Sequence, residues 1–170
     1  MARKSRWSPK SGTDISVVSP TLPANSLEYS VAIYARLSVR DSGRDENDTM
    51  ENQLGLLRHY VMQQPDLTLC DLYIDNGWSG TNFARPEFRR MLQDIYAGKI
   101  NCVIVKDLSR LGRNHLETAY YLQEVFVTQH IRFISVNDGY DSLTSPPDSI
   151  EIMAKNIISS YYSKESSRNV

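Results

Sequence analysis

Short apolar segments alternate with amphipathic ones along most of this chain, and this alternation constrains the fold more than any other feature. Four segments are strand-like in composition: Val31 to Arg36, Thr68 to Asp75, Cys102 to Val105 and Ile131 to Val136. Helix-like segments separate them. Strands that are separated by helices require right-handed crossover connections. The sequence therefore predicts an α/β fold in which a mainly parallel central sheet carries helices on both faces.

Helix boundary signals support this reading. Asp48-Thr49-Met50-Glu51 resembles a capping box, and Met50, Leu54, Leu57 and Val61 then recur at helical spacing. Pro86 suits the first turn of a second helix, which Gly98 ends. A third amphipathic helix is predicted from Leu116 to Val127. The segment from Gly139 to Ser149 is polar and is predicted to be a loop.

The chain divides into three parts. Residues 1–28 are rich in Ser, Pro, Lys and Arg and are predicted to form a disordered N-terminal arm. Residues 29–148 form the predicted globular domain. Residues 149–170 read as the start of a long helix, since no Gly or Pro closes the run from Ile150 to Asn169. We therefore expect a domain cut from a longer protein, without a DNA-reading module such as a zinc finger or a helix-turn-helix.

Composition limits the class of protein. A length of 170 residues suits one domain with a real core. No apolar run approaches the ~20 residues of a membrane span, and no signal-peptide-like stretch follows the basic N-terminus. These observations predict a cytoplasmic protein with no membrane partner. Cys70 and Cys102 lie in strand-like segments, which favours core packing over a disulfide or a metal site.

The formal net charge is −1, which by itself weighs against a nucleic-acid partner. The charge is uneven along the chain, however. Basic residues concentrate between Arg85 and Arg113, whereas Asp41 to Glu51 is acidic. A local concentration of positive charge can serve a site even when the total charge is near zero.

Polar segments follow three of the predicted strands directly. Ser38 follows the first strand, Asp75 to Thr81 the second, and Leu108 to Asn114 the third. In an open parallel sheet the active crevice lies outside the carboxyl ends of the strands. We therefore expect these loops to meet at one edge of the sheet.

The residues of these loops suit chemistry on a phosphate. A serine hydroxyl needs activation, but no histidine is placed as its base and there is no G-x-S-x-G elbow. Guanidinium groups instead donate charge-assisted, bidentate hydrogen bonds to phosphate oxygens. Arg36 is two residues from Ser38 and shares its side of a strand. Arg110 and Arg113 are three apart and share a face if they lie on a helical turn.

Each motif alone has a plainer explanation. The segment from Asp75 to Gly80 contains the turn dipeptides Asn-Gly and Ser-Gly, and Arg110 to Arg113 could be a solvated turn before the next helix. Tyr-x-Arg-x-Ser at a strand end is weak on its own. The occurrence of all three after successive strands favours a serine nucleophile with an arginine clamp.

From about Ser30 to its end, the chain resembles the serine site-specific DNA recombinases, which include resolvases, invertases and the large transposon and phage integrases. The resemblance rests on Tyr34-Ala35-Arg36-Leu37-Ser38, Gln53, Asp75 with Ser79-Gly80, Arg85-Pro86, and Val103 to Asn114. The long spacing between Ser38 and Gln53, and a serine at Ser109 where small resolvases usually carry an aspartate, look most like the large conjugative-transposon type. Asp107 is nearby, but the motif does not align it with the site.

This resemblance implies site-specific recombination, namely integration or excision of a mobile element. Ser38 would cut a DNA strand without a metal or other cofactor and become joined to the 5′ phosphate before rejoining. The implied partners are double-stranded DNA and further copies of the chain, as a homodimer that assembles into a tetramer on DNA. The direction of the reaction and the target site stay open.

The resemblance also implies residue roles. The catalytic set would be Ser38, Arg36, Arg110, Arg113, Arg85 and Tyr34. Within it, three arginines (Arg36, Arg110, Arg113) would hold the phosphate with Arg85 in support, and which arginine protonates the leaving oxygen stays open. Gln53, Asp75 and Ser79 would form a supporting shell. Ser109, Glu165 and Arg168 are further candidates, although the segment around the last two departs from the family pattern. No metal ligands are implied.

Two other classes of protein compete with this reading. The first is a non-catalytic dimerisation or regulatory fragment of a recombinase, against which the intact serine and arginine set argues. The second is a flavodoxin-like phosphate-signalling domain on the same type of sheet. That class needs a glycine-rich phosphate loop or clustered acidic residues directly after the first strand, and the sequence has neither there.

Overall fold

The computed structural model describes residues 28–37, 49–81, 83–145 and 149. Within them, five strands form one sheet in the order β2-β1-β3-β4-β5. The strands are β1 (Tyr29–Leu37), β2 (Leu67–Asn76), β3 (Cys102–Val105), β4 (Arg132–Ser135) and β5 (Tyr140–Asp141). The first four are parallel and β5 is antiparallel to β4. The predicted mainly parallel α/β fold is confirmed, while β5 lies in the segment that was predicted to be a loop.

The helical segments are α1 (Met50–Met62), α2 (Pro86–Tyr96), α3 (Leu108–Leu111), α4 (His115–Tyr120), the π-helical η1 (Tyr121–Val125) and α5 (Phe126–Thr128). Thr49 caps α1, since its hydroxyl accepts a hydrogen bond of 3.2 Å from the backbone N–H of Asn52. Gly98 follows the end of α2 with a φ of 71°. Both boundary predictions are therefore confirmed.

The helix predicted from Leu116 to Val127 is a continuous helical run with a π-helical middle section. The wider turn begins at Tyr121, whose ring centroid lies 4.6 Å from that of Phe83 and 4.9 Å from that of Phe88. Tertiary packing of this ring thus accompanies the departure from regular α-helical geometry.

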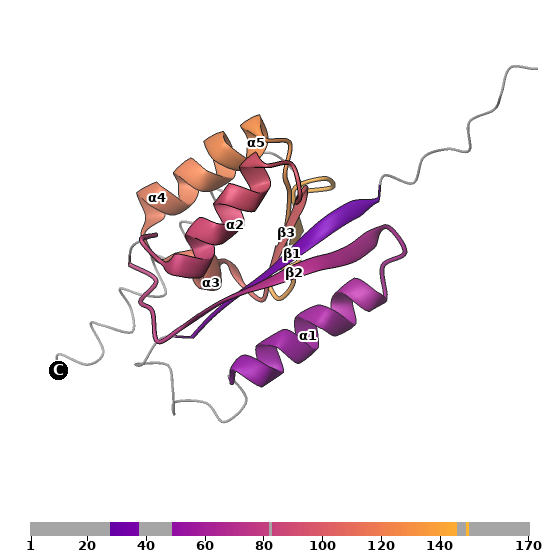
Figure 1. Cartoon of the computed structure of the whole chain (residues 1–170), viewed down its shortest axis with the longest axis horizontal. Coiled ribbons are helices and arrows are strands. Elements are labelled where there is room, and N and C mark those ends of the chain that lie inside the picture. The colour runs from indigo at the N-terminus through magenta and orange to yellow at the C-terminus, as the bar shows by residue number, and fades with distance from the viewer. Residues whose placement is uncertain (1–27, 38–48, 82, 146–148, 150–170) are drawn as a thin grey trace, which may run out of the picture.

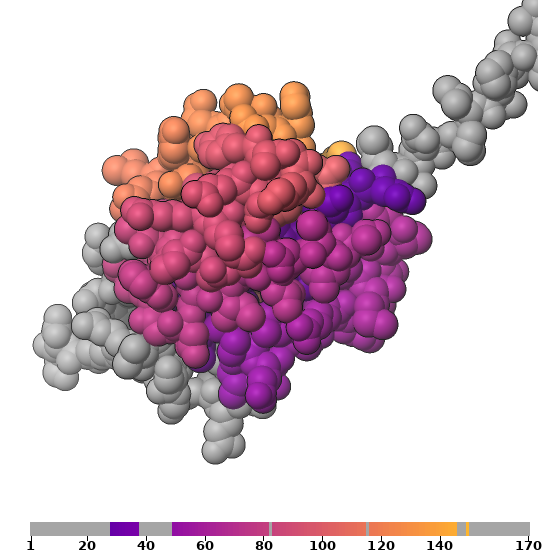
Figure 2. Space-filling view, in the orientation of Figure 1, coloured from indigo at the N-terminus to yellow at the C-terminus, as the bar shows by residue number. Residues whose placement is uncertain are grey.

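Helices cover both faces of the sheet. Helix α1 lies on one face, and α2 lies with the α4–α5 run on the other (Figure 1). Strand β1 alternates between two apolar clusters: Val31 and Ile33 pack with Leu57 of α1, whereas Ala32 and Tyr34 belong to the cluster of α2. This period of two is that of a strand buried on both sides. Figure 2 shows α1, β2 and α2 as a closely packed surface on the side that faces the viewer.

The two cysteines differ in their environment, and the prediction of core packing is wrong for one of them. Cys102 on β3 is buried, but Cys70 on β2 is exposed, and both thiols are free. Strand β2 is at the edge of the sheet, and its register with β1 shifts between Val31 and Ala32, which pair with Leu69 and Asp71. Cys70 is the extra residue of this bulge.

Other predictions fall on parts of the chain that the structure does not describe. The N-terminal arm, apart from its last residue, and the helix from Ile150 to Asn169 lie outside the described residues. None of the helices in the described ranges combines the length and the apolar character that crossing a membrane requires.

A pair of glycine substitutions tests this packing. A Cβ at Gly112 would lie 2.3 Å from Cζ of Phe83, so Gly112→Ala should destabilise the fold by about 1–3 kcal/mol through overpacking. Gly55 lies within α1 with no atom near its Cβ position, so Gly55→Ala should stabilise by about 0.5–1 kcal/mol. Urea unfolding measures both, and effects of the same sign would contradict the described packing.

Candidate active site

The Arg36 side chain joins the end of β1 to the segments that follow β2 and β3. Its Nη1 donates to the carbonyl of Trp78 at 3.0 Å, its Nη2 to that of Ser109 at 2.8 Å, and its Nε to that of Arg110 at 3.3 Å. The residue is 0% exposed. The predicted meeting at one edge of the sheet is therefore confirmed for the segments that follow β2 and β3, whereas Ser38 lies outside the described residues.

Arg110 lies directly against Arg36. Its Nη1 donates to the Arg36 carbonyl at 3.3 Å, and its Nε forms an ion pair with Oδ2 of Asp107 at 3.5 Å. The residue is almost fully buried. Its side chain is thus held between the end of β1 and the residue that precedes α3.

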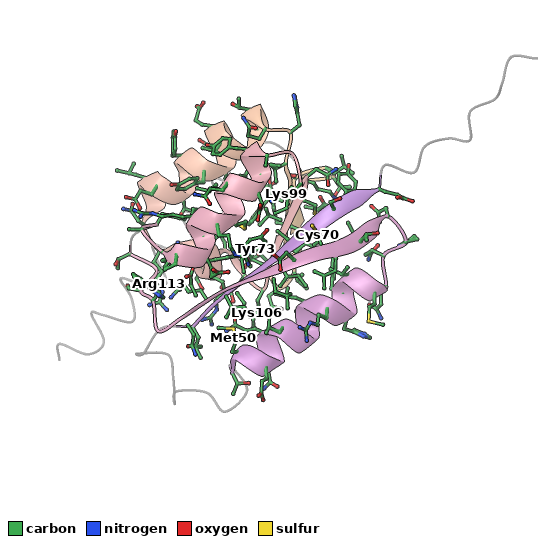
Figure 3. All side chains as sticks on the ribbon, viewed as in Figure 1. Met50, Cys70, Tyr73, Lys99, Lys106 and Arg113 are labelled. Atoms are coloured by element: carbon green, nitrogen blue, oxygen red, sulfur yellow. The ribbon has the colours of Figure 1, made fainter. Side chains whose placement is uncertain are left out.

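Arg113 reaches the same place by a different route from the one predicted. Helix α3 ends at Leu111, and Gly112 has extended backbone, so Arg110 and Arg113 do not share a helical face. Instead, the backbone N–H of Arg113 donates to the carbonyl of Gly80 at 2.7 Å. Figure 3 shows Arg113 beside the connection between β2 and α2.

Four arginines therefore gather at this edge: Arg36, Arg85, Arg110 and Arg113. Burial, together with the charges of Arg113 and Arg85, lowers the pKa of Arg36 to about 10. Arg36 is still protonated at neutral pH, because that value lies well above 7. A buried cluster of like charges is costly without an anion, and it attracts one.

A hydrogen-bonded network of Tyr34, Asp75 and Arg85 lies beneath the arginines. The Tyr34 hydroxyl donates to Oδ2 of Asp75 at 3.0 Å and accepts from Nη1 of Arg85. The other terminal nitrogen of Arg85 donates to the carbonyl of Leu111 at 2.5 Å. Burial raises the pKa of Tyr34 well above its ordinary value, so its hydroxyl stays protonated and keeps its role as a donor.

This network also fixes the start of α2. The carboxylate of Asp75 accepts from the backbone N–H groups of Glu87 at 3.1 Å and Phe88 at 3.0 Å. A carboxylate at a helix N-terminus is favourable because it satisfies N–H groups that have no partner within the helix.

The guanidinium of Arg85 is enclosed by aromatic rings, 4.6 Å from the centroid of Phe83 and 5.1 Å from that of Phe88. Burial is the main cause that lowers its pKa. Arg85 and Tyr34 are both 0% exposed. They therefore lie below the surface of the site, where they contact Asp75 and the carbonyl of Leu111.

The remaining predicted residues lie in varied places. Gln53 is buried on α1. Ser79 is exposed, and its hydroxyl lies 3.0 Å from that of Thr81. The Ser109 hydroxyl donates to Oδ1 of Asp107. Ser38, Glu165 and Arg168 lie outside the described residues, which contain no cluster of three or more His, Cys, Asp or Glu side chains able to hold a metal ion.

Asp107 is the residue that the motif comparison left outside the site, and the structure brings it into contact with two site residues, Ser109 and Arg110. Its position three residues before Arg110 was the available signal, because side chains at that spacing meet on a helical turn.

Comparison with known proteins agrees with this geometry. The profile of a family described as "Resolvase, N terminal domain" matches residues 31–170. The chain therefore belongs to this family of serine recombinase catalytic domains, and the resemblance found in the sequence is confirmed. No curated protein matches the chain.

Solved structures agree as well. The chain is similar to the N-terminal catalytic domain of TP901-1 integrase, with 29% identity over 83% of this chain and 99% of that one, and a TM-score of 0.62. A serine recombinase from Sulfolobus solfataricus is 26% identical over 65% of this chain and 69% of that one, with a TM-score of 0.50. A resolvase family site-specific recombinase from Streptococcus pneumoniae shares the fold, at 24% identity over 84% of this chain and 91% of that one and a TM-score of 0.57.

Loss of the Tyr34 hydroxyl tests the buried network. Tyr34→Phe leaves the buried donor of Arg85 and an oxygen of Asp75 without this partner, so unfolding free energy should fall by about 1–3 kcal/mol. Tyr73→Phe is the matched control, because its hydroxyl donates to Asp94, a partly exposed carboxylate outside this network. Chemical denaturation measures the unfolding free energy of both variants. An equal decrease for Tyr34→Phe and Tyr73→Phe would contradict a special role for the network.

Proposed function

We propose that this chain catalyses site-specific DNA recombination, the integration or excision of a mobile element, with Ser38 as the nucleophile. The observation that carries the proposal is the position of the arginine cluster at the end of β1. Ser38 directly follows the last residue of that strand, Leu37, and Arg36 ties the strand end to the loops that carry Arg110 and Arg113. Family membership supports the same reaction class.

The proposed step exchanges one phosphodiester for another. The Ser38 oxygen forms a bond to phosphorus, and the bond from phosphorus to the 3′ oxygen breaks. The serine loses its proton and the departing 3′ oxygen gains one, so the products are a 5′ phosphoserine ester and a 3′ hydroxyl. Attack of a 3′ hydroxyl on the ester reverses the step and rejoins the strand, which requires no ATP.

The arginines would act on the charge of the phosphate. Negative charge increases on the phosphate oxygens as the transition state forms, and fixed guanidinium groups stabilise it. We assign Arg110 and Arg113 to the phosphate directly. Arg36 would contribute charge while its donors hold the loops, and one arginine of the cluster would protonate the 3′ oxygen.

The other residues would support this arrangement. Tyr34, Asp75 and Arg85 hold it from beneath through the buried network, and they are positioning residues in this proposal. Gln53, Ser79 and Ser109 belong to the proposed surrounding shell. Glu165 and Arg168 remain candidates at the far end of the chain.

Double-stranded DNA is the proposed substrate, bound by a homodimer that assembles into a tetramer for strand exchange. The division into an arm (1–28), a catalytic domain (29–148) and a long dimerisation helix (149–170) belongs to the same proposal. A DNA substrate is consistent with the cytoplasmic location expected from the sequence.

A covalent trapping experiment tests the nucleophile. The chain is fused to a DNA-binding domain of known site and incubated in EDTA with nicked duplexes that carry the site. Wild type and the control Ser42→Ala should form a protein–DNA adduct on a denaturing gel, whereas Ser38→Ala should form none and keep the wild-type melting temperature. An adduct made by Ser38→Ala would refute the assignment, and no adduct from wild type would favour a non-catalytic fragment.

Replacement of Arg110 tests the clamp. Arg110→Lys keeps the positive charge but loses the planar guanidinium and its paired donors. We expect adduct formation to slow by about 100-fold or more, the usual cost of removing one transition-state donor. Arg89→Lys, an exposed change on the outer side of α2, is the control. A near-normal rate for Arg110→Lys would show that Arg110 does not contact the phosphate.

A further inference from the structure

We propose that Asp107 is a positioning residue that holds the Arg110 guanidinium in the orientation needed for phosphoryl transfer. This inference rests on the proposed function, and it assigns a role to a carboxylate that the motif comparison left outside the site. The Asp107 side chain does not act on DNA in this proposal; it acts through Arg110.

Both carboxylate oxygens of Asp107 contact site residues. Oδ2 lies 3.5 Å from Nε of Arg110, an ion pair without hydrogen-bond geometry, and Oδ1 accepts from the Ser109 hydroxyl. The side chains are 9% exposed for Arg110 and 22% exposed for Asp107. Partial burial of the pair reduces screening by water and salt, so the pair constrains the guanidinium more than a surface pair would.

The cap of α3 explains why this carboxylate is available. Asp107 occupies the N-cap position of α3, where an aspartate usually accepts from an N–H of its own helix, but its side chain makes no such bond. Asp138 of the β4–β5 connection takes that role instead, because its Oδ2 accepts from the Leu108 N–H at 2.7 Å. The same oxygen accepts from the Ser135 hydroxyl at 2.5 Å. The start of the helix is thus satisfied from another part of the chain, and Asp107 is left to bind Arg110.

Asp107 also connects to Arg36 through Ser109. The hydroxyl of Ser109 donates to Asp107, while the carbonyl of Ser109 accepts from Arg36 at 2.8 Å. One carboxylate therefore contacts Arg110 directly and contacts the residue whose carbonyl holds Arg36. Displacing it should disturb the relative placement of two site cations.

Other described carboxylates near the site or on α2 have different partners. Asp75 is bound by Tyr34 and the start of α2. Glu87 and Asp94 form ion pairs with Arg90, in the surface network of α2. The geometry gives Asp107, by contrast, a direct contact with an arginine of the cluster.

The rate of adduct formation tests the role. Asp107→Asn keeps an acceptor for Ser109 but removes the charge that faces Arg110. At saturating nicked duplex, in the fusion described above, its maximal rate should fall by about 10- to 100-fold, the range expected when a catalytic group is misplaced by about 1 Å. The DNA concentration for half-saturation should not change. Asp94→Asn, in the α2 surface network, is the matched control and should react at the wild-type rate.

A double-mutant cycle separates positioning of Arg110 from a general structural effect. If Asp107 acts through Arg110, then Asp107→Asn should cause no further loss in an Arg110→Lys background. A full, independent loss in that background would overturn the inference, and so would a wild-type rate for Asp107→Asn alone.

An NMR measurement without DNA tests the contact between Asp107 and Arg110 independently of catalytic activity. In the NMR spectrum of the 170-residue chain, the Arg110 Nε–H signal is assigned by its loss in Arg110→Lys. Its exchange with water should be several-fold faster in Asp107→Asn than in wild type. Unchanged exchange would refute the positioning of Arg110 by Asp107. A wild-type chain that forms no adduct but shows faster exchange in Asp107→Asn would refute the proposed function and leave the positioning supported.

Discussion

The contacts of the Arg36 guanidinium with three backbone carbonyls are the interaction on which the site depends. A parallel sheet brings strand ends to one edge, but it does not fix the loops that follow them. Arg36 does so, because it is fully buried and donates to Trp78, Ser109 and Arg110. Each hydrogen bond from a charged donor contributes about 1.5–3 kcal/mol, and each buried carbonyl left without a partner carries its own cost. The arginine is therefore as much an organiser of the loops as a source of charge.

The buried groups below and beside Arg36 show how a chain of nearly neutral net charge keeps a cationic site. Tyr34 and Asp75 bind Arg85 and the start of α2 within the aromatic cluster. Asp107 supplies negative charge next to Arg110. The positive charge of the cluster is compensated on its protein side, and in the proposed function a phosphate lies on the other side. The positions of the charged groups around a site, and not the net charge of the whole chain, decide which ligand the site attracts.

The alternation of strands and helices was enough to predict the parallel sheet and the meeting of its loops, because both follow from local periodicity and chain connectivity. Features that depend on tertiary contacts were not predictable. Strand β5 has only two residues, Tyr140 and Asp141, too few for a periodic pattern. Cys70 is exposed because β2 is an edge strand with a bulge. Arg113 approaches through a backbone bond to the β2–α2 connection. The proposed role of Asp107 depends on a helix cap that Asp138, between β4 and β5, supplies.

Mass spectrometry of the trapped adduct tests the central claim most directly. The adduct is digested with nuclease and protease, and the modified peptide is fragmented to locate the nucleotide. The account predicts a nucleotide joined through its 5′ phosphate to Ser38, together with a 3′ hydroxyl on the released strand. A nucleotide on any other residue, or a 3′ phosphate linkage, would contradict it.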